Sequence, residues 1–319
     1  MEFISKQRCN KVRFYTKGFS QHLLVPKAWF RSRLAHKLAK IEHYDSQPIH
    51  ERVNYYNKIE TPFNVSPEAL DLKSIPLSKK SAYYYDMRAL LRHYPASVRI
   101  DYKFGDVRNT AVIPTLVKSR AIAGDNDNNI LLKLNQVRHF LPIEDNVCYE
   151  GKRDLLVWRG GAKKQWRKDF LRDYWNHPLC NVGMVNGPRH SDDREEWMRP
   201  KMSIAEQLQY KFILSMEGND VATNLKWIAQ SNSLCFMTRP KFETWMMEGH
   251  LIGGKHYVEL RDDYADLAEK IEYFTSNPDA AKEMIRNFQD YYRQFTNSEL
   301  EELISLMVVK KYLECSGQA

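Results

Sequence analysis

Residues 203–237, SIAEQLQYKFILSMEGNDVATNLKWIAQSNSLCFM, decide the fold class, because helix and strand patterns alternate along them. Ser203 followed three residues later by Glu206 is the capping-box pattern of a helix start. The apolar runs KFILSM (211–216) and SLCFM (233–237) predict strands, and ATNLKWIAQS between them predicts a helix. Strands that alternate with helices in this way pair in parallel, with the helices crossing over the sheet. The stretch therefore predicts an α/β domain.

The same alternation extends in both directions from this stretch. Upstream, DLLVW (154–158) and CNVGMV (180–185) are typical of strands, with a basic helix between them near 163–176. Downstream, KHYVEL (255–260) predicts another strand, and three helical segments follow from Asp263 onward.

The chain of 319 residues is longer than one hydrophobic core usually organises, so two domains are expected. We assign residues 1–150 to a less regular first domain and 151–296 to the α/β domain. A last helix at about 297–319 is expected to pack back on the first domain. Within the first domain, SAYYYDMRALLRHY (81–94) predicts a helix and SVRIDYKF (97–104) a strand, whereas 1–75 predicts short helices and loops.

The charge and residue composition indicate which kinds of partner and location to expect. Lys and Arg number 48 against 40 Asp and Glu, a net charge of +8, which favours anionic partners such as phosphates, nucleic acid or acidic membranes. No apolar run approaches the roughly 20 residues that span a bilayer. The start, MEFISKQRCNKVRF, lacks the apolar stretch of a secretory signal, so a cytosolic location is expected. The five cysteines are far apart and form no CxxC pair, so we expect neither disulfides nor structural zinc.

Ligands of open α/β sheets bind beyond the carboxyl ends of the strands, which makes the residues after each strand the first candidates. WRGG (158–161) ends one strand: Arg159 offers forked donors for phosphate oxygens, and Gly160 lets a backbone approach a ligand. The basic helix that follows holds Lys163, Lys164, Arg167 and Lys168. A strand-ending turn before a solvated basic helix explains the same residues equally well.

EGNDVATNLKW (217–227) follows the next strand. Gly218 comes directly after that strand, Asn219 or Asp220 is suited to cap a helix, and Lys226 adds a cation. A helix N-terminus beside a cation binds anions. The GxxxxGK[ST] and GxGxxG patterns are absent, so an ordinary strand-to-helix turn remains an alternative.

RPKFETWMMEG (239–249) follows a third strand. Glu243 or Glu248 could accept hydrogen bonds from ribose hydroxyls, and Trp245 is either an aromatic face for the ligand or a buried anchor.

The first domain supplies acidic candidates. Asp106 of FGD (104–106) ends a strand and could act as a general base or as a simple turn residue, with VKSR (117–120) following. Asp125 and Asp127 are spaced like the metal-binding DxD of some glycosyltransferases, but the same residues are typical of a polar turn.

The order of these pieces resembles glycosyltransferase family 90, which includes bacterial lipopolysaccharide-core sugar transferases, fungal capsule proteins and eukaryotic protein O-glucosyltransferases. The segments that carry the resemblance are YKFGDV, IPTLVKSR, GDNDNNILLKLNQVRHF, LVWRGG, SIAEQLQYKFILSMEGNDVATNLKW, RPKFETWMMEG and HYVELRDDYADLAEKI. It covers roughly residues 80–315 and is closest to the bacterial members. It implies a GT-B fold of two Rossmann-like domains facing a cleft, the first binding the acceptor and the second a UDP-sugar. It also implies inversion at the anomeric carbon, with no metal or other cofactor.

The resemblance also implies roles for single residues. Asp106 falls at the position of the catalytic base, and Arg159 matches the arginine near the donor diphosphate. Glu217 and Asn224 stand where eukaryotic members have arginines, a loss of charge that other cations would have to offset. The expected donor-binding residues are Arg159, Gly160, Ser119, Arg120, Gly218, Asn219, Asn224, Lys226, Arg239 and Glu243.

The sequence thus predicts a transferase that moves a hexose, glucose or galactose, from a UDP-sugar to a lipopolysaccharide-core or other glycan hydroxyl. We expect it in the cytoplasm, with possible peripheral contact with the anionic inner membrane. Two alternatives stay open: a non-catalytic protein that docks on anionic membrane, and a nucleic-acid-binding protein. No RRM-type motif or contiguous basic stripe supports the second, so no nucleic-acid partner is expected.

Overall fold

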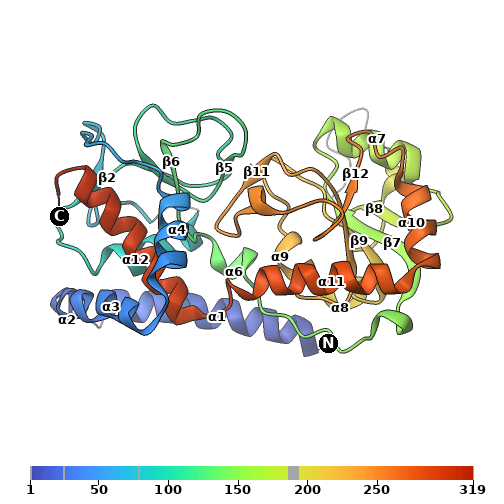
Figure 1. Ribbon diagram of the computed structural model, residues 1–319, viewed down its shortest axis with the longest axis horizontal. Coiled ribbons are helices and arrows are strands. Elements are labelled where there is room, and N and C mark those ends of the chain that lie inside the picture. Colours follow the sequence, from blue (N-terminus) through green and yellow to red (C-terminus); the bar gives the residue numbers. More distant parts are fainter. Residues whose placement is uncertain (1, 24–25, 78–79, 186–193, 319) are drawn as a thin grey trace.

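The computed structural model describes residues 2–23, 26–77, 80–185 and 194–318, and a five-stranded parallel sheet is the centre of its second half (Figure 1). The strands are β7 (Arg153–Gly160), β8 (Cys180–Met184), β9 (Tyr210–Leu214), β10 (Leu234–Thr238) and β12 (Val258–Leu260). Their order is β12-β10-β9-β7-β8, with every pair parallel. The predicted α/β class with parallel strands is confirmed.

This strand order has a switch point between β7 and β9. The chain leaves β7 in one direction to form β8, and it returns to the other side of β7 to form β9 and then the remaining strands. In sheets of this kind the connections diverge at the switch point and leave a crevice at the carboxyl ends of the two strands. Gly160 and Leu214 are the last residues of β7 and β9, so the segments after them are the first place to look for a ligand site.

Helices cover both faces of the sheet. Side chains that alternate along the strands enter two clusters, one with Leu156 and Phe212 and the other with Val157 and Ile213. The first cluster includes residues of α7 (Gln165–Tyr174), α10 (Leu267–Ser276) and the start of α11 (Pro278–Arg293). The second includes the end of α11 and continues into the first half of the chain.

The remaining helices beside this sheet are shorter than predicted. The capping box is confirmed, because Ser203 Oγ accepts from the Glu206 amide at 3.2 Å and the Glu206 carboxylate accepts from the Ser203 amide at 2.6 Å. The helix it starts, α8 (Ile204–Gln207), is only one turn long. The helix predicted after Gly218 is also a single turn, α9 (Leu225–Ile228).

The first half contains a small parallel sheet and several helices. The predicted helix over 81–94 is α5 (Ser81–Leu91), and α6 (Gln136–His139) follows the sheet. The sheet is formed by β3 (Tyr102–Lys103), β4 (Thr115–Val117) and β6 (Asn129–Leu131).

The strand predicted over 97–104 is divided at Asp101. Its first part, β2 (Arg99–Ile100), pairs antiparallel with β1 (Leu70–Asp71), whereas its second part is β3. The Asp101 carboxylate accepts from the Ser66 amide at 2.9 Å, while its carbonyl accepts from the Leu116 amide at 2.8 Å. The chain therefore changes partners at this residue.

The N-terminal region is more helical than predicted. It forms α1 (Glu2–Leu23), α2 (Lys27–Ser32), α3 (Leu34–Ala39), a 3₁₀ turn (Lys40–His43) and α4 (Ser46–Tyr56). The long α1 lies against α5 and α6, where a tyrosine of α5, Tyr85, packs on Gly18. Among the described helices none is long and apolar enough to cross a bilayer.

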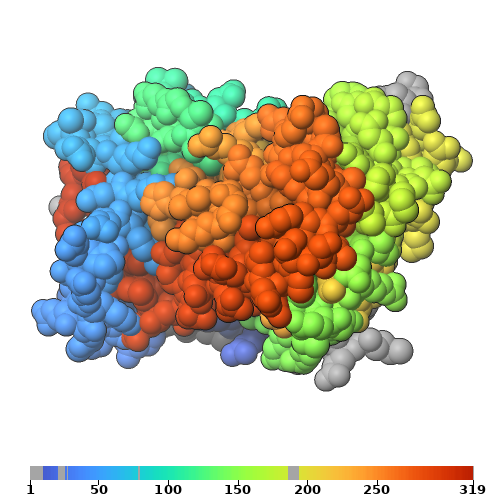
Figure 2. All heavy atoms as spheres, turned by 45° about the vertical axis from the view of Figure 1, so that its right-hand side comes forward, coloured from blue at the N-terminus to red at the C-terminus, as the bar shows by residue number. Residues whose placement is uncertain are grey.

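Two features join the halves. The strand β5 (Arg120–Ala121) pairs antiparallel with β11 (Phe242–Glu243), which follows β10. The last helix, α12 (Ser298–Cys315), packs against α3, α4 and α5. Figure 2 shows the C-terminal segments, in orange and red, lying between the blue N-terminal segment and the yellow-green region around α7.

Candidate functional site

The chain segments that follow β7 and β9 are held together by Arg167 of α7. Its guanidinium donates to the carbonyls of Gly161 at 3.0 Å, Met216 at 2.6 Å and Glu217 at 3.1 Å. These carbonyls follow β7 and β9, so Arg167 holds both strand ends together. A Cβ atom on Gly218 would lie 3.4 Å from the same guanidinium. The sequence indicated Arg167 only as one of several cations on a basic helix.

Asp106 lies where the first half contacts the segment that follows β9. Its Oδ1 lies 2.9 Å from Lys118 Nζ, and its Oδ2 accepts a hydrogen bond from Asn219 Nδ2 at 3.2 Å. Asp106 and Lys118 belong to the loops around β3 and β4, whereas Asn219 follows β9. The structure therefore brings the predicted base and the predicted donor segment into direct contact, although they are 113 residues apart in the chain.

A second carboxylate completes this cluster. Asp220 Oδ2 lies 2.7 Å from Lys118 Nζ and accepts from Ser119 Oγ at 2.6 Å. Ser119 Oγ also accepts from the amide of Val107, 3.3 Å away. The Lys118 and Asp220 side chains are 4% and 6% exposed, against 39% for Asp106. Of the three charged side chains, Asp106 is thus the one open to an incoming molecule.

The pKa values of Asp106 and Asp220 are shifted in opposite directions. Partial burial would raise the pKa of Asp106, but the hydrogen bond and charge of Lys118 and the hydrogen bond from Asn219 hold that pKa below its usual value. Burial raises the pKa of Asp220 in spite of the same lysine and the Ser119 hydroxyl. Asp106 is therefore ionised at neutral pH and able to accept a proton.

Arg159 and Gly160 lie at the end of β7, and the Arg159 guanidinium binds residues of β8 and the segment before α8. It donates to the carbonyls of Asn181 at 2.7 Å and Pro200 at 3.0 Å, and to Asn181 Oδ1 at 2.8 Å. Burial lowers the pKa of Arg159. In this arrangement Arg159 ties β7 to β8.

Two of the side chains predicted to bind the donor as cations, Lys226 and Arg120, are buried in the core. Lys226 is fully buried and pairs with Glu248, whose carboxylate also accepts from the Thr244 hydroxyl and amide. Arg120 pairs with Glu243 at 2.7 Å, directly across the β5–β11 pair. Lys226, Arg120 and Glu243 therefore have no exposed surface with which to contact a donor in this structure.

The predicted helix-terminus anion site is not formed. The amide of Gly218 donates to the carbonyl of Asp220 at 3.0 Å, and α9 begins only at Leu225. Asn224 donates to the Leu214 carbonyl at 2.9 Å. Arg239, just after β10, is the predicted donor cation whose side chain is exposed.

Comparison with known proteins adds an independent line of evidence. The family model for glycosyl transferase family 90 matches residues 131–312, and O-glucosyltransferase LpsA of Dichelobacter nodosus is 45% identical over 307 residues, 95% of each chain. The chain belongs to glycosyl transferase family 90. Protein O-glucosyltransferase 3 of Homo sapiens is 22% identical over 179 residues, which are 54% of this chain and 35% of that protein.

Membership of glycosyl transferase family 90 confirms the resemblance on which the sequence analysis relied, and it makes this chain a glycosyltransferase. The matched range begins after Asp106, Ser119 and Arg120. Of the three, Asp106 and Ser119 contact the segment that follows β9, whereas Arg120 pairs with Glu243.

The DxD residues of this family 90 chain form a turn. The Asp125 carboxylate accepts from the Asp127 amide at 3.2 Å, and Asp127 lies 3.5 Å from Lys58 Nζ. Within the described ranges, no group of three or more His, Cys, Asp or Glu side chains is placed to hold a metal ion. The contacts fit the polar-turn interpretation of this segment.

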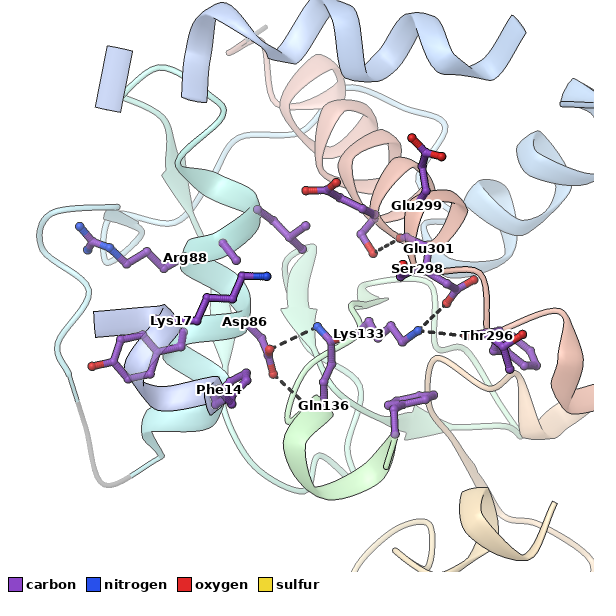
Figure 3. A pocket seen from close by; sticks show the side chains of 18 of the residues that line it. Phe14, Lys17, Asp86, Arg88, Lys133, Gln136, Thr296, Ser298, Glu299 and Glu301 are labelled. Carbon is purple, nitrogen blue, oxygen red and sulfur yellow. Dashed lines mark hydrogen bonds and ion pairs between the residues drawn. The ribbon is translucent and has the colours of Figure 1, made fainter. Parts of the chain in front are cut away.

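A separate cavity of about 720 Å³ lies between α1, α5, α6 and α12 (Figure 3). Its wall includes the buried Asp86, which accepts from the Gln136 amide at 2.9 Å, and Lys133, which pairs with Glu301 at 2.9 Å. Burial raises the pKa of Asp86 to about 7. Neither Asp106 nor the switch-point residues line this cavity, so we do not assign it to the transfer reaction.

Lys118, Asp220 and His139 surround Asp106 or its neighbours only through tertiary contacts, so the sequence did not predict them as site residues. Lys118 was noted only as part of VKSR and Asp220 only as an alternative helix cap, and His139 was not singled out. His139 is buried with Nδ1 unpartnered among the described residues, and burial and nearby Lys226 and Lys118 keep its pKa well below the usual value. No sequence pattern marks these residues, because their partners come from distant segments.

Proposed function

We propose that this glycosyltransferase moves a hexose, glucose or galactose, from a UDP-sugar to a hydroxyl of a lipopolysaccharide-core or similar glycan, with inversion at the anomeric carbon. The observation that carries the proposal is the contact between Asp106 and Asn219, which brings a carboxylate of the first half next to the segment after β9, where ligands of such sheets bind. A glucosyl donor is supported by the printed name of the Dichelobacter nodosus relative, O-glucosyltransferase LpsA. A GT-B arrangement would place the acceptor on the Asp106 side and the donor over β7 and β9.

The chemistry is a single displacement. The acceptor oxygen attacks the anomeric carbon while Asp106 takes its proton, so the new C–O bond forms as the bond to the diphosphate oxygen breaks. UDP leaves with the bonding electron pair from the opposite face, and the anomeric configuration inverts. Positioned general-base help of this kind contributes roughly 10²–10⁴-fold to the rate.

The leaving diphosphate needs positive charge or hydrogen-bond donors as the bond breaks. Arg159, Arg120 and Lys226 are each engaged elsewhere in this structure. We therefore assign the diphosphate to the region between the strand-end glycines, with the exposed Arg239 and the exposed Lys163 as the available cations. No metal is needed in this scheme.

A panel of sugar nucleotides tests the donor. We expect UDP to raise the melting temperature, and one of UDP-glucose and UDP-galactose to release UDP when a glycan acceptor is supplied. Failure of every UDP-sugar both to stabilise the protein and to release UDP would overturn the proposal.

The metal requirement is tested in the same assay. Activity should persist in excess EDTA. Complete loss with EDTA and recovery with Mn²⁺ would contradict the metal-free scheme and would make Asp125 and Asp127 the candidate ligands.

The proposed location is the cytoplasm, with peripheral contact at the inner face of an anionic membrane, where a lipid-linked glycan would be available. Non-catalytic docking and nucleic-acid binding, which the sequence left open, are not favoured by any contact around Asp106.

A further inference from the structure

The net charge of the chain is confined to one segment. Residues 1–44 hold ten of the 48 Lys and Arg residues and two of the 40 Asp and Glu residues, so the other 275 residues hold 38 of each. The whole excess of +8 therefore belongs to the helices α1 to α3 and the turn that follows them. These helices run along the lower edge in Figure 1, whereas the loops around β5 and β6 lie at the upper edge.

Apolar side chains are exposed among these charges. On α1, Val12 is 66% exposed and Phe19 57%, and on α2, Trp29 is 45% exposed. Val12, Tyr15 and Phe19 are spaced three and four residues apart, which places them along one stripe of the helix. Phe14 and Gly18 lie on the other side and contact Tyr85 of α5. Tyr15 also contacts Tyr85 and accepts a hydrogen bond from the Ser81 hydroxyl, so Val12 and Phe19 are the members of the stripe that face away from the protein.

Cations surround the exposed apolar residues. Lys11, Arg13 and Lys17 of α1 are exposed, and the Arg33 guanidinium lies 4.1 Å from the Trp29 ring centre. A hollow of about 400 Å³ is lined by Arg33, His36, Lys37 and Lys40. Lys37 and Lys40 pair with Glu302 and Glu299 of α12, while Arg33 and His36 are exposed.

We propose that the outer face of α1 to α3 binds an anionic lipid bilayer, with Val12, Phe19 and Trp29 entering the interface and the surrounding cations contacting lipid phosphates. A helix with exposed aromatic and aliphatic residues between Lys and Arg is suited to lie in a membrane interface. A soluble anion would use the cations alone, whereas a bilayer also buries the exposed apolar residues in its interface. The inference deepens the proposed function, since transfer to a lipid-linked glycan takes place at a bilayer.

Co-sedimentation with vesicles tests the surface. We expect the full chain to bind vesicles in which one third of the lipid is phosphatidylglycerol, and to remain in solution with phosphatidylcholine vesicles. Lys11→Glu with Arg13→Glu should weaken binding by roughly tenfold or more. Lys255→Glu with Arg286→Glu, which makes the same charge change at two exposed positions elsewhere, should leave it nearly unchanged.

A second pair of variants separates lipid from other anions. Phe19→Ser with Trp29→Ser keeps every charge and should still weaken binding several-fold. The proposal is overturned if the unmodified chain ignores the anionic vesicles, if this pair binds as well as the unmodified chain, or if the two charge-reversed proteins lose binding equally. Binding to a random DNA duplex with none to vesicles would overturn it as well.

Activity on a water-soluble acceptor, measured without vesicles, distinguishes this inference from the proposed function. The surface variants should keep that activity, and Asp106→Asn should lose it while still binding vesicles. Vesicle binding without any sugar transfer would remove the proposed function and leave the surface assignment standing.

Discussion

At the scale of single residues, Lys118 controls the proton affinity of the proposed base. It lies between Asp106 and Asp220, and their charges outweigh burial and raise its own pKa. Lys118→Met removes the cation that lowers the pKa of Asp106, so that pKa should rise. The acidic limb of the pH profile of kcat/KM should move to higher pH by the same amount. This profile reports the pKa values of the essential groups in the free enzyme.

Lys118→Arg is the matched control for this prediction. It retains the positive charge and should keep the acidic limb close to its original position. An unchanged limb in a folded Lys118→Met protein would mean that Asp106 is not the group that titrates there.

Glu217 is a second residue with a shifted proton affinity. Burial raises its pKa to about 7, although its Oε1 accepts from the amides of Lys241 and Phe242. The folded protein therefore binds this proton more tightly than the unfolded chain does, and the resulting stability is lost as pH rises through about 7. Glu217→Gln keeps an oxygen acceptor and removes the titration.

The free energy of unfolding should accordingly fall between pH 5 and pH 8 by about 3 kcal/mol more in the unmodified protein than in Glu217→Gln. Urea unfolding at several pH values measures this difference. Asp86, whose pKa is also raised to about 7, contributes equally to both proteins and cancels in the comparison. If the two proteins differ in free energy of unfolding by the same amount at every pH in this range, Glu217 does not have the raised pKa.

At the scale of elements, the β5–β11 pair joins the two halves through a buried ion pair. Arg120 and Glu243 have side chains 0% and 3% exposed, and Tyr55 also donates to the Glu243 carboxylate. Glu243→Gln leaves the guanidinium buried without a counter-charge, which should cost about 3 kcal/mol or more of stability in urea unfolding.

The exposed pair Lys241–Asp262, with side chains 61% and 70% exposed, is the matched control. Asp262→Asn should cost less than ~1 kcal/mol, because solvent already screens that pair. Equal costs for the two substitutions would contradict the structural role given to Arg120 and Glu243.

The elements differ in how far local sequence could predict them. The strands β7 to β10 and β12 follow from apolar runs, and the Ser203 capping box follows from two residues, because both signals depend on near neighbours. The division of β2 from β3 depends on the hydrogen bond between Asp101 and Ser66, 35 residues away. The alternation of apolar and polar residues along the strand does not indicate that contact. The length of α1 was missed for the same reason, since it depends on packing against α5.

At the scale of the whole molecule, the sequence predicted Asp106 and the 218–219 turn as site residues, but it could not predict which cations accompany them. Arg120 and Glu243 are 123 residues apart and neutralise each other in the core, and Lys226 finds Glu248 in the same way. Lys118 and Arg167 take the positions beside the reactive carboxylate and the strand ends. Only the fold reveals which charges are already partnered.

The whole account depends on Asp106 acting as the base at the junction of the two halves, and turnover of Asp106→Asn tests it most directly. Asparagine preserves size and can still accept a hydrogen bond from Lys118 through its single side-chain oxygen, but it cannot take a proton at neutral pH. Turnover should fall by roughly 10²-fold or more, while UDP affinity stays the same because the base serves the acceptor. Near-normal turnover in a folded Asp106→Asn protein would contradict the account.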